Sequence, residues 1–363
     1  MKVIVFSDLH IGDHKKFARV DEQTGLNRRL IDGFDVLQNI FDYAVDEDIK
    51  HVFFCGDLFH DGSSLTPPMV LYTFEALQRF AIHGIPLFLL HGQHDLMTQY
   101  GGWTAIRPFP EMLDYDMTKD SSGVVLGHVE YDDFELLIAP YHRDFSKLRE
   151  AFKGEHARST KPVFFLGHFL IKEVLEKEGV PYADTVDCIS VEELPKGCDF
   201  YFIGDYHKHV YLPEHKLMSV GCAQHISFNE ANYGRPCFVV YDTETGKYEL
   251  VETGAPAFWK VDYETFENNI PVGPDEERIR MKDYVKIEIN DSVKMAIAKD
   301  EYSDWNIEYD LKLEESDQPD AKQRIDVEVA SNPVDVIVRY GAHKKADEET
   351  QKLGIEIYKE GLI

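Results

Sequence analysis

The chain has 363 residues, of which 44% are hydrophobic and 29% charged, a balance that indicates a globular protein of two or three domains and excludes a disordered chain. The formal net charge of −28 excludes a general nucleic-acid coat, because such proteins neutralise phosphates with lysine and arginine. No apolar run approaches the ~20 residues of a membrane span and no signal peptide is evident, so we expect a cytoplasmic protein without a membrane partner.

The first third of the chain alternates short apolar runs with helical patterns. Strands are predicted where such runs end in polar residues, at 2–6, 51–55 and 85–90. Apolar residues recur at helical spacing over 31–45, and a second helix is predicted from Pro67 to Gly84. This alternation predicts a layered α/β fold whose strands are parallel at this end of the chain.

Strands dominate the middle of the chain. The runs with strand character lie at 124–131, 134–141, 163–170 and 199–207. Residues 237–252 predict a hairpin with its turn at Thr-Glu-Thr-Gly. Proline, glycine and charge become frequent around 271–280, which indicates a domain boundary.

Beyond this boundary the sequence predicts a smaller α+β module. Alternating strands are expected at 284–290 and 325–331, and a terminal helix at 343–361. Residues 299–320 hold nine acids against two lysines. A solvated acidic face is the ordinary interpretation of that run, and a partner surface is the alternative. At physiological salt, screening acts over ~8 Å, so distant acidic surface does not exclude an enzyme that acts on nucleic acid.

Metal-binding residue types follow five of the predicted strands. In chain order they are Asp8, His10, Asp57, Gln93, His94, Asp95, His168, Asp205 and His207. Loops at the carboxyl ends of parallel strands converge, and carboxylate and imidazole suit Mn²⁺, Fe²⁺ or Zn²⁺. In Asp8-x-His10 we expect both side chains on one side of an extended chain. Alone, Asp57 could cap a turn and His168 could be a core histidine, but the ordered set predicts a dinuclear metal site.

This order resembles that of the calcineurin-like metallophosphoesterases, whose pattern is D-x-H, G-D, G-N-H-D, G-H and G-H-x-H. Within them, SDLHIG (7–12), GDLFH (56–60) and SVGCAQHISFNE (219–230) resemble the SbcD family, nucleases of bacteria and phages that act with an SMC-like ATPase. The resemblance is close to about residue 252 and extends only by layout beyond it. It implies a layered sandwich of two sheets flanked by helices at 1–255, a smaller α+β capping domain at 275–331, and a C-terminal helical segment at 332–363. That segment is a candidate docking element for the ATPase, with a helix that packs on the domain as the alternative.

The resemblance also implies roles for the site residues. Asp8, His10 and His207 would hold one ion, Asp57 both, and Gln93, His168 and Asp205 the other. His94, steered by Asp95, would assist departure of the 3′ oxygen, and His60 would contact DNA. The implied protein is a Mn²⁺-dependent DNA exonuclease with endonuclease or hairpin-opening activity. It would bind two Mn²⁺ ions, with Mg²⁺ or another divalent metal as the alternative. It would form a homodimer and work with an SbcC-type ATPase in DNA end processing, recombination and repair. In a phage protein, the location would be the host cytoplasm.

Two positions depart from the family pattern, since Gln93 stands in place of asparagine and Asp205 in place of histidine. Glutamine is longer by about 1.5 Å, whereas metal–ligand distances tolerate only ~0.2 Å. It keeps the same carbonyl donor, so we expect a second metal that is bound differently rather than one that is absent. His207 and His209 remain an alternative pair, and Gln93 could be an introduced change.

Two alternative functions remain open. One is a small-molecule phosphodiesterase or protein phosphatase of the same fold, against which His60 and residues 219–230 weigh. The other is a catalytically impaired nuclease subunit with a structural role, against which the survival of the remaining ligand residues weighs.

Overall fold

The computed structural model describes residues 1–97, 103–109, 125–180, 187–231, 233–269 and 279–312. The chain divides into two compact units, the first of which comprises Met1–Glu288 and Ile297–Asp310. The second unit combines 289–296 with 311–363 and lies largely outside the described residues. Every residue of the predicted site belongs to the first unit.

The first sheet has the strand order β11-β10-β1-β2-β3. At its centre β1 (Lys2–Phe6) pairs in parallel with β2 (His51–Phe54), which pairs in parallel with β3 (Leu87–Leu89). The connections run through α1 (Arg28–Asp46) and α2 (Pro67–Ile82). The predicted alternation of parallel strands and helices is therefore confirmed at this end of the chain.

The far edge of this sheet is the predicted hairpin. It consists of β10 (Cys237–Asp242) and β11 (Tyr248–Glu252), which pair antiparallel to each other, and β10 also pairs antiparallel to β1. β10, more than 200 residues after β1 in the sequence, thus lies beside β1 in the sheet.

The second sheet has the order β4-β5-β6-β7-β9-β8, with β5, β6, β7 and β9 parallel. Its strands are β4 (Gly127–Glu130), β5 (Glu135–Ala139), β6 (Val163–His168), β7 (Phe200–Gly204), β8 (Val210–Leu212) and β9 (Leu217–Ser219). The helices that accompany it are α4 (Phe145–Phe152) and α5 (Lys172–Lys177), together with 3₁₀ turns at Val191–Glu193 and Pro213–His215.

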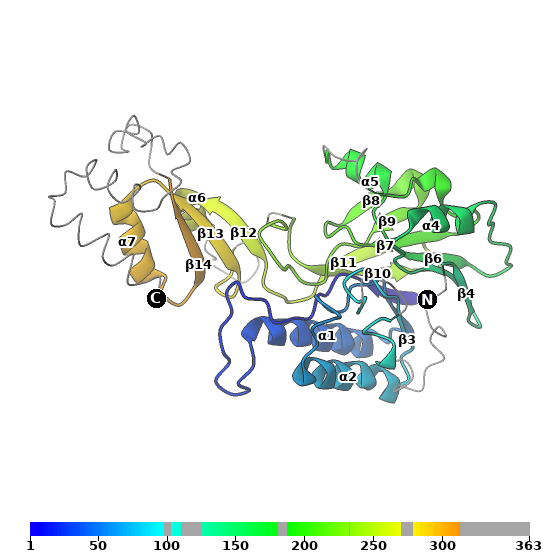
Figure 1. Cartoon of the computed structure of the whole chain (residues 1–363), viewed down its shortest axis with the longest axis horizontal. Coiled ribbons are helices and arrows are strands. Elements are labelled where there is room, and N and C mark those ends of the chain that lie inside the picture. Colours follow the sequence, from blue (N-terminus) through cyan, green and yellow to red (C-terminus); the bar gives the residue numbers. More distant parts are fainter. Residues whose placement is uncertain (98–102, 110–124, 181–186, 232, 270–278, 313–363) are drawn as a thin grey trace, which may run out of the picture. The chain divides into compact units, whose positions relative to one another are not determined.

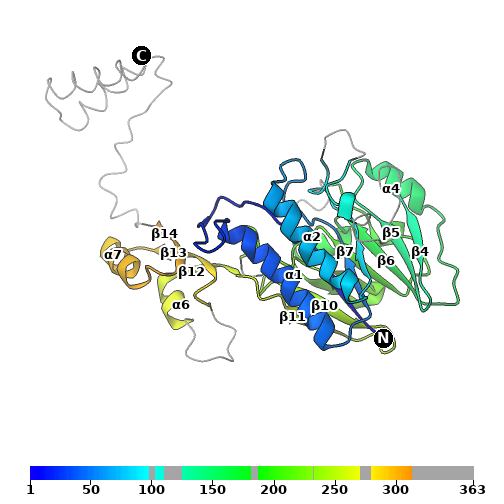
Figure 2. The ribbon, with the colours of Figure 1, turned by 90° about the horizontal axis from the view of Figure 1, so that it is seen from below.

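The two sheets pack face to face. Val5 and Phe53 of the first sheet share one buried cluster with Phe164 and Phe202 of the second. A second cluster joins the first sheet to α1 and α2, which lie side by side (Figure 1). A third joins the second sheet to α4 and α5, so helices cover both outer faces (Figure 1). Figure 2 looks onto the face that α1 and α2 cover. The predicted sandwich of two sheets flanked by helices is confirmed.

A three-stranded sheet follows, in the order β12-β13-β14. Its strands are β12 (Phe258–Asp262), β13 (Tyr284–Ile289) and β14 (Asn306–Leu311), and its helices are α6 (Tyr263–Asn268) and α7 (Ser292–Glu301). β14 occupies part of the acidic run that the sequence alone indicated as a solvated face. The strand expected at 325–331 and the helix expected at 343–361 lie outside the described residues. Across the described part of the chain, no helix has the length and apolar character needed to cross a bilayer.

Candidate metal centre

The predicted ligand residues lie at the C-terminal ends of strands from both large sheets, at the edge where these ends come together. Asp8 and Asp57 follow β1 and β2 of the first sheet, whereas His168 ends β6 and Asp205 follows β7 of the second. Direct contacts join the sheets here. The Nδ1–H of His168 donates to the carbonyl of Cys55 at 2.6 Å, and the amide of Asp205 donates to the carboxylate of Asp8 at 3.2 Å. Residues far apart in sequence therefore share one site.

Asp8, His10 and His207 form the first group of ligand atoms. The Nε2 atoms of the two histidines lie 3.1 Å apart, and Oδ1 of Asp8 lies 4.0 Å from the first and 3.7 Å from the second. Two nitrogen donors at right angles, each ~2.1 Å from one shared ion, would lie about 3 Å apart. The alternative ligand His209 lies outside the ligand groups of the described residues, with its Nδ1 3.3 Å from the carbonyl oxygen of Val220. The histidine beside Asp8 and His10 is thus His207 and not His209, which agrees with the pairing of Asp205 and His207 rather than that of His207 and His209.

Asp8, Asp57 and His168 form the second group, and all three are at most 1% exposed. Nε2 of His168 lies 3.3 Å from Oδ2 of Asp57. Within the described residues, Oδ1 of Asp8, Oδ2 of Asp57 and Nε2 of His168 have no hydrogen-bond partner. Buried polar atoms without a hydrogen-bond partner are costly, and these three atoms are of the donor types that divalent ions bind. The residues present therefore fit divalent metal ions.

The backbone turns sharply at the ligand residues. Asp8, His10, Asp57 and Asp205 have φ angles of 52°, 51°, 61° and 91°, and they are four of the seven non-glycine residues with positive φ in the described part of the chain. Such conformations cost ~1–3 kcal/mol each and persist where the surrounding structure fixes them. The expectation that Asp8 and His10 share one side of an extended chain is therefore wrong, because a turn at each residue aims its side chain.

Two glycines permit the close approach of the loops. A Cβ on Gly92 would lie 2.1 Å from Oδ1 of Asp57. A Cβ on Gly204 would lie 2.3 Å from Oγ of Ser7 and 2.4 Å from the carbonyl oxygen of Cys55. Only a residue without a side chain fits at either position.

The carboxylates and imidazoles of the centre shift one another's pKa values. Burial opposes protonation of His168, but Asp57, followed by Asp8 and Asp205, outweighs it and raises the pKa of His168 well above its usual value. Burial would raise the pKa of Asp57, yet His168 and His10 hold it low. Burial raises the pKa of Asp205 to about 6. The carboxylates thus require compensating positive charge, which protons or divalent ions can supply.

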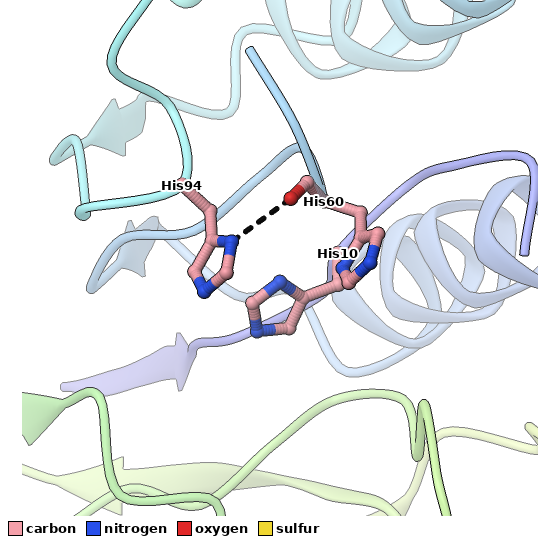
Figure 3. Close-up of side chains that lie close together, drawn as sticks. All are labelled: His10, His60 and His94. Carbon is pink, nitrogen blue, oxygen red and sulfur yellow. Dashed lines mark hydrogen bonds between the residues drawn. The ribbon is translucent and has the colours of Figure 1, made fainter. Parts of the chain in front are cut away.

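His10 also belongs to a third group, with His60 and His94, whose ligand atoms lie within 4.8 Å of one another. Figure 3 shows these three imidazoles. The Nδ1–H of His94 donates to the carbonyl of His60 at 2.9 Å. The backbone amide of His94 donates to Oδ1 of Asp57 at 2.8 Å. Because Nδ1 of His94 donates its proton to a carbonyl, Nε2 is the ring nitrogen that is left to accept or donate a proton in a reaction.

Asp95 makes contacts that differ from the predicted ones. Its fully buried carboxylate accepts hydrogen bonds at 2.9–3.3 Å from four backbone amides, those of Asp57, Leu58, Phe59 and Gly92. The imidazole of His94 is held instead by the carbonyl of His60. The prediction that Asp95 orients the imidazole of His94 by direct contact is therefore wrong. Asp95 braces the two loops that carry Asp57 and His94.

The two residues that depart from the family pattern contact each other. Nε2 of Gln93 donates to Oδ1 of Asp205 at 3.0 Å. Gln93 is longer than the asparagine of the family pattern, and Asp205 is shorter than the histidine, so the two changes compensate each other in length. Asp205 lies beside the ligand groups, but it belongs to none of those within the described residues whose donor atoms lie within 4.8 Å of one another.

Glu230 is a further site residue that the sequence did not single out. Its Oε1 accepts the Nδ1–H of His207 at 2.9 Å, which leaves Nε2 of His207 directed at Asp8 and His10. A carboxylate behind a ligand histidine is a common way to fix its orientation. Glu230 is the last residue of the stretch 219–230 that carries the family resemblance, and this position is the signal in the sequence that points to it.

Comparisons with known proteins agree with this geometry. A family model described as calcineurin-like phosphoesterase matches residues 1–209. The chain is 25% identical over 210 residues to the DNA double-strand break repair protein Mre11 of Sulfurisphaera tokodaii, and 24% identical over 209 residues to that of Sulfolobus acidocaldarius, each match covering 57% of this chain. These matches cover 49% and 50% of the two relatives, so the chain spans about half the length of the curated relatives it matches.

Among solved structures, a dimetal phosphatase from Danio rerio aligns with a TM-score of 0.39 at 9% identity, over 66% of this chain and 91% of that one. The family model covers more than half of the 363 residues and includes all the strand-end ligand residues. Proteins of that family bind two divalent metal ions, for which the groups described above supply donors. The chain belongs to the calcineurin-like phosphoesterase family.

Proposed function

We propose that the chain is a Mn²⁺-dependent DNA nuclease subunit of SbcD type, an exonuclease with endonuclease or hairpin-opening activity. The observation that carries the proposal is the position of His94, whose imidazole lies against His10 at the edge of two groups of buried metal donors. The names of the Mre11 relatives, which describe repair of DNA double-strand breaks, support DNA as the substrate.

The metal-binding residues are proposed as two sets that share one aspartate. Asp8, His10 and His207 would hold one ion, Asp57 both, and Gln93, His168 and Asp205 the other. Two bound divalent ions supply Lewis-acid activation of water and charge stabilisation on a phosphate group.

The chain's own groups have separate roles in this proposal. His94, with Nδ1 held by the carbonyl of His60, offers Nε2 to pass a proton to the departing 3′ oxygen. The imidazole of His60 lies nearly parallel to that of His94, at 5.7 Å between ring centroids, and would contact the DNA strand. Asp95 fixes the loop of Asp57 and the loop of His94 relative to each other through hydrogen bonds to their backbone amides.

The partners are also proposals. By family resemblance, the chain would form a homodimer and work with an SbcC-type ATPase in DNA end processing, recombination and repair. The net charge of −28 supports a basic partner surface, because tight DNA binding by this chain alone would meet repulsion from the phosphates. Two strands of the small sheet, β13 and β14, fall within the proposed capping domain at 275–331, whereas β12 precedes its proposed boundary. The proposed docking segment at 332–363 lies outside the described residues.

A nuclease assay with Mn²⁺ on single-stranded, blunt-ended and hairpin DNA, with and without the candidate ATPase, tests this function. His94→Ala should lower the cleavage rate by roughly 10²- to 10⁴-fold, the usual contribution of a general acid. His83→Ala is the matched control, because the exposed His83 also donates its Nδ1–H to a backbone carbonyl, that of Arg79, at 2.9 Å.

Cleavage of cyclic nucleotides without cleavage of any DNA would establish the small-molecule alternative. Unchanged DNA processing by His94→Ala would overturn the proposed role of this residue.

A further inference from the structure

An exposed aromatic ring lies next to a cation on the segment that follows the His94 loop. Trp103 is 60% exposed, and the guanidinium carbon of Arg107 lies 5.1 Å from the centroid of its ring. Four of the residues that follow Trp103 are buried, with exposures of 2–5% for Thr104, Ala105, Ile106 and Phe109. The exposed ring of Trp103 is therefore attached to a segment that packs into the protein.

Backbone hydrogen bonds fasten this segment to the loop of the candidate general acid. The amide of Ala105 donates to the carbonyl of Asp95 at 2.7 Å, and the amide of Met97 donates to the carbonyl of Trp103 at 2.9 Å. Met97 is itself 42% exposed. Met97 lies three positions after His94, a span of at most ~10 Å. This span equals about three nucleotides of a stacked strand at ~3.4 Å each.

The chemistry of the pair matches an unpaired nucleotide. An exposed indole offers a flat face on which a base can stack, and a guanidinium adds attraction for the π-system and for phosphate. Bases inside a duplex are stacked on their neighbours and cannot reach such a face without being extruded. The chain has a net charge of −28, and the guanidinium of Arg107 places a positive charge beside this exposed ring.

We propose that Trp103 and Arg107 form a stacking platform for an unpaired base of the substrate strand, and that single-stranded DNA ends are therefore preferred over blunt duplex. This inference rests on the proposed nuclease function and specifies its substrate. The platform binds the strand on one side of the scissile phosphate, while the metal ligands and His94 act on the phosphate itself.

Binding of a fluorescently labelled oligothymidylate to the full chain, with Ca²⁺ in place of Mn²⁺, tests the platform by anisotropy. Trp103→Leu should weaken binding roughly 5- to 100-fold, the usual effect of losing one stacked base. Trp103→Phe keeps a π-face and should bind more tightly than Trp103→Leu. Tyr72→Leu is the control, because Tyr72 of α2 is an aromatic residue that is 40% exposed and packs on Phe34.

Tryptophan emission gives a second measurement on the same samples. The chain has three tryptophans, of which Trp259 donates its indole N–H to Asp283 at 3.0 Å and Trp305 packs against Phe266. Oligothymidylate should quench wild-type emission, and this quenching should disappear in Trp103→Phe although the oligonucleotide still binds.

Each contrary result has a distinct meaning. Equal affinity of the wild type, Trp103→Leu and Trp103→Phe overturns the platform. DNA cleavage by the wild type without any change in tryptophan emission also overturns the platform and leaves the nuclease proposal standing. Hydrolysis of bis(p-nitrophenyl) phosphate by a wild type that cleaves no DNA overturns the nuclease proposal itself, and the platform with it.

Discussion

Replacing Glu230 with glutamine tests whether the contact behind His207 sets metal affinity. Glu230 is 5% exposed, and its Oε1 accepts the Nδ1–H of His207 at 2.9 Å. Its Oε2 accepts the amide and the hydroxyl of Ser227 at 2.8 and 2.9 Å. The carboxylate is thus fixed on one side by Ser227 and in turn fixes the imidazole, whose Nε2 is directed at Asp8 and His10.

The size of the effect follows from the change in hydrogen bonding. Glutamine keeps the length of Glu230, but it loses the charge and replaces one acceptor with a donor. A hydrogen bond to a charged group contributes about 1.5–3 kcal/mol and a neutral one about 0.5–1.5 kcal/mol. The difference of about 1–1.5 kcal/mol corresponds to roughly a tenfold change in an equilibrium constant. Losing the outer partner of a ligand histidine commonly costs 10- to 100-fold in metal affinity, so we expect one Mn²⁺ dissociation constant to rise about tenfold.

Calorimetric titration with Mn²⁺ and the Mn²⁺ dependence of DNA cleavage measure this change. The Glu230→Gln activation curve should move to about tenfold higher Mn²⁺ and approach the wild-type rate at saturation. Glu173→Gln is the matched control, because the carboxylate of Glu173 accepts the hydroxyl of Ser190 at 2.6 Å and the amide of Val191 at 2.9 Å in a similar pattern. Superimposable curves for the two variants would refute the reasoning.

Three further predictions concern the loops of the centre. Gly92→Ala places a Cβ 2.1 Å from Oδ1 of Asp57, so the Mn²⁺ content per chain, measured by elemental analysis, should fall below that of the wild type; an unchanged content would contradict the steric argument. Gln93→Ala removes the 3.0 Å hydrogen bond to Asp205 and should reduce two bound ions to one; a wild type that binds only one ion would show that this pair holds none. Asp95→Asn directs an amide group at backbone N–H donors and should lower the free energy of unfolding by about 2–4 kcal/mol in urea titrations, whereas a change below about 1 kcal/mol would mean that the four hydrogen bonds contribute little.

The strands that the sequence predicted well are those whose side chains are buried in the sandwich. β1 and β10 match their expected positions because a buried strand is a short run of apolar residues between polar ones. β11 is half-buried or exposed, and the turn signal that joins it to β10 indicated its position. β12 and β14 were missed. Every residue of β14 is only half-buried, and the strand lies in an acidic run, so its conformation depends on pairing within a sheet.

For the metal centre, the sequence by itself determined the kinds of donor and their positions after strands. Only the tertiary structure decided which atoms meet. It favoured His207 over His209, gave Asp95 the backbone amides as partners, and joined Glu230 to His207. The physical reason is that donor type is a property of single residues, whereas a contact such as that between His10 and His207, 197 residues apart, depends on sheet pairing and on left-handed turns that no local pattern specifies.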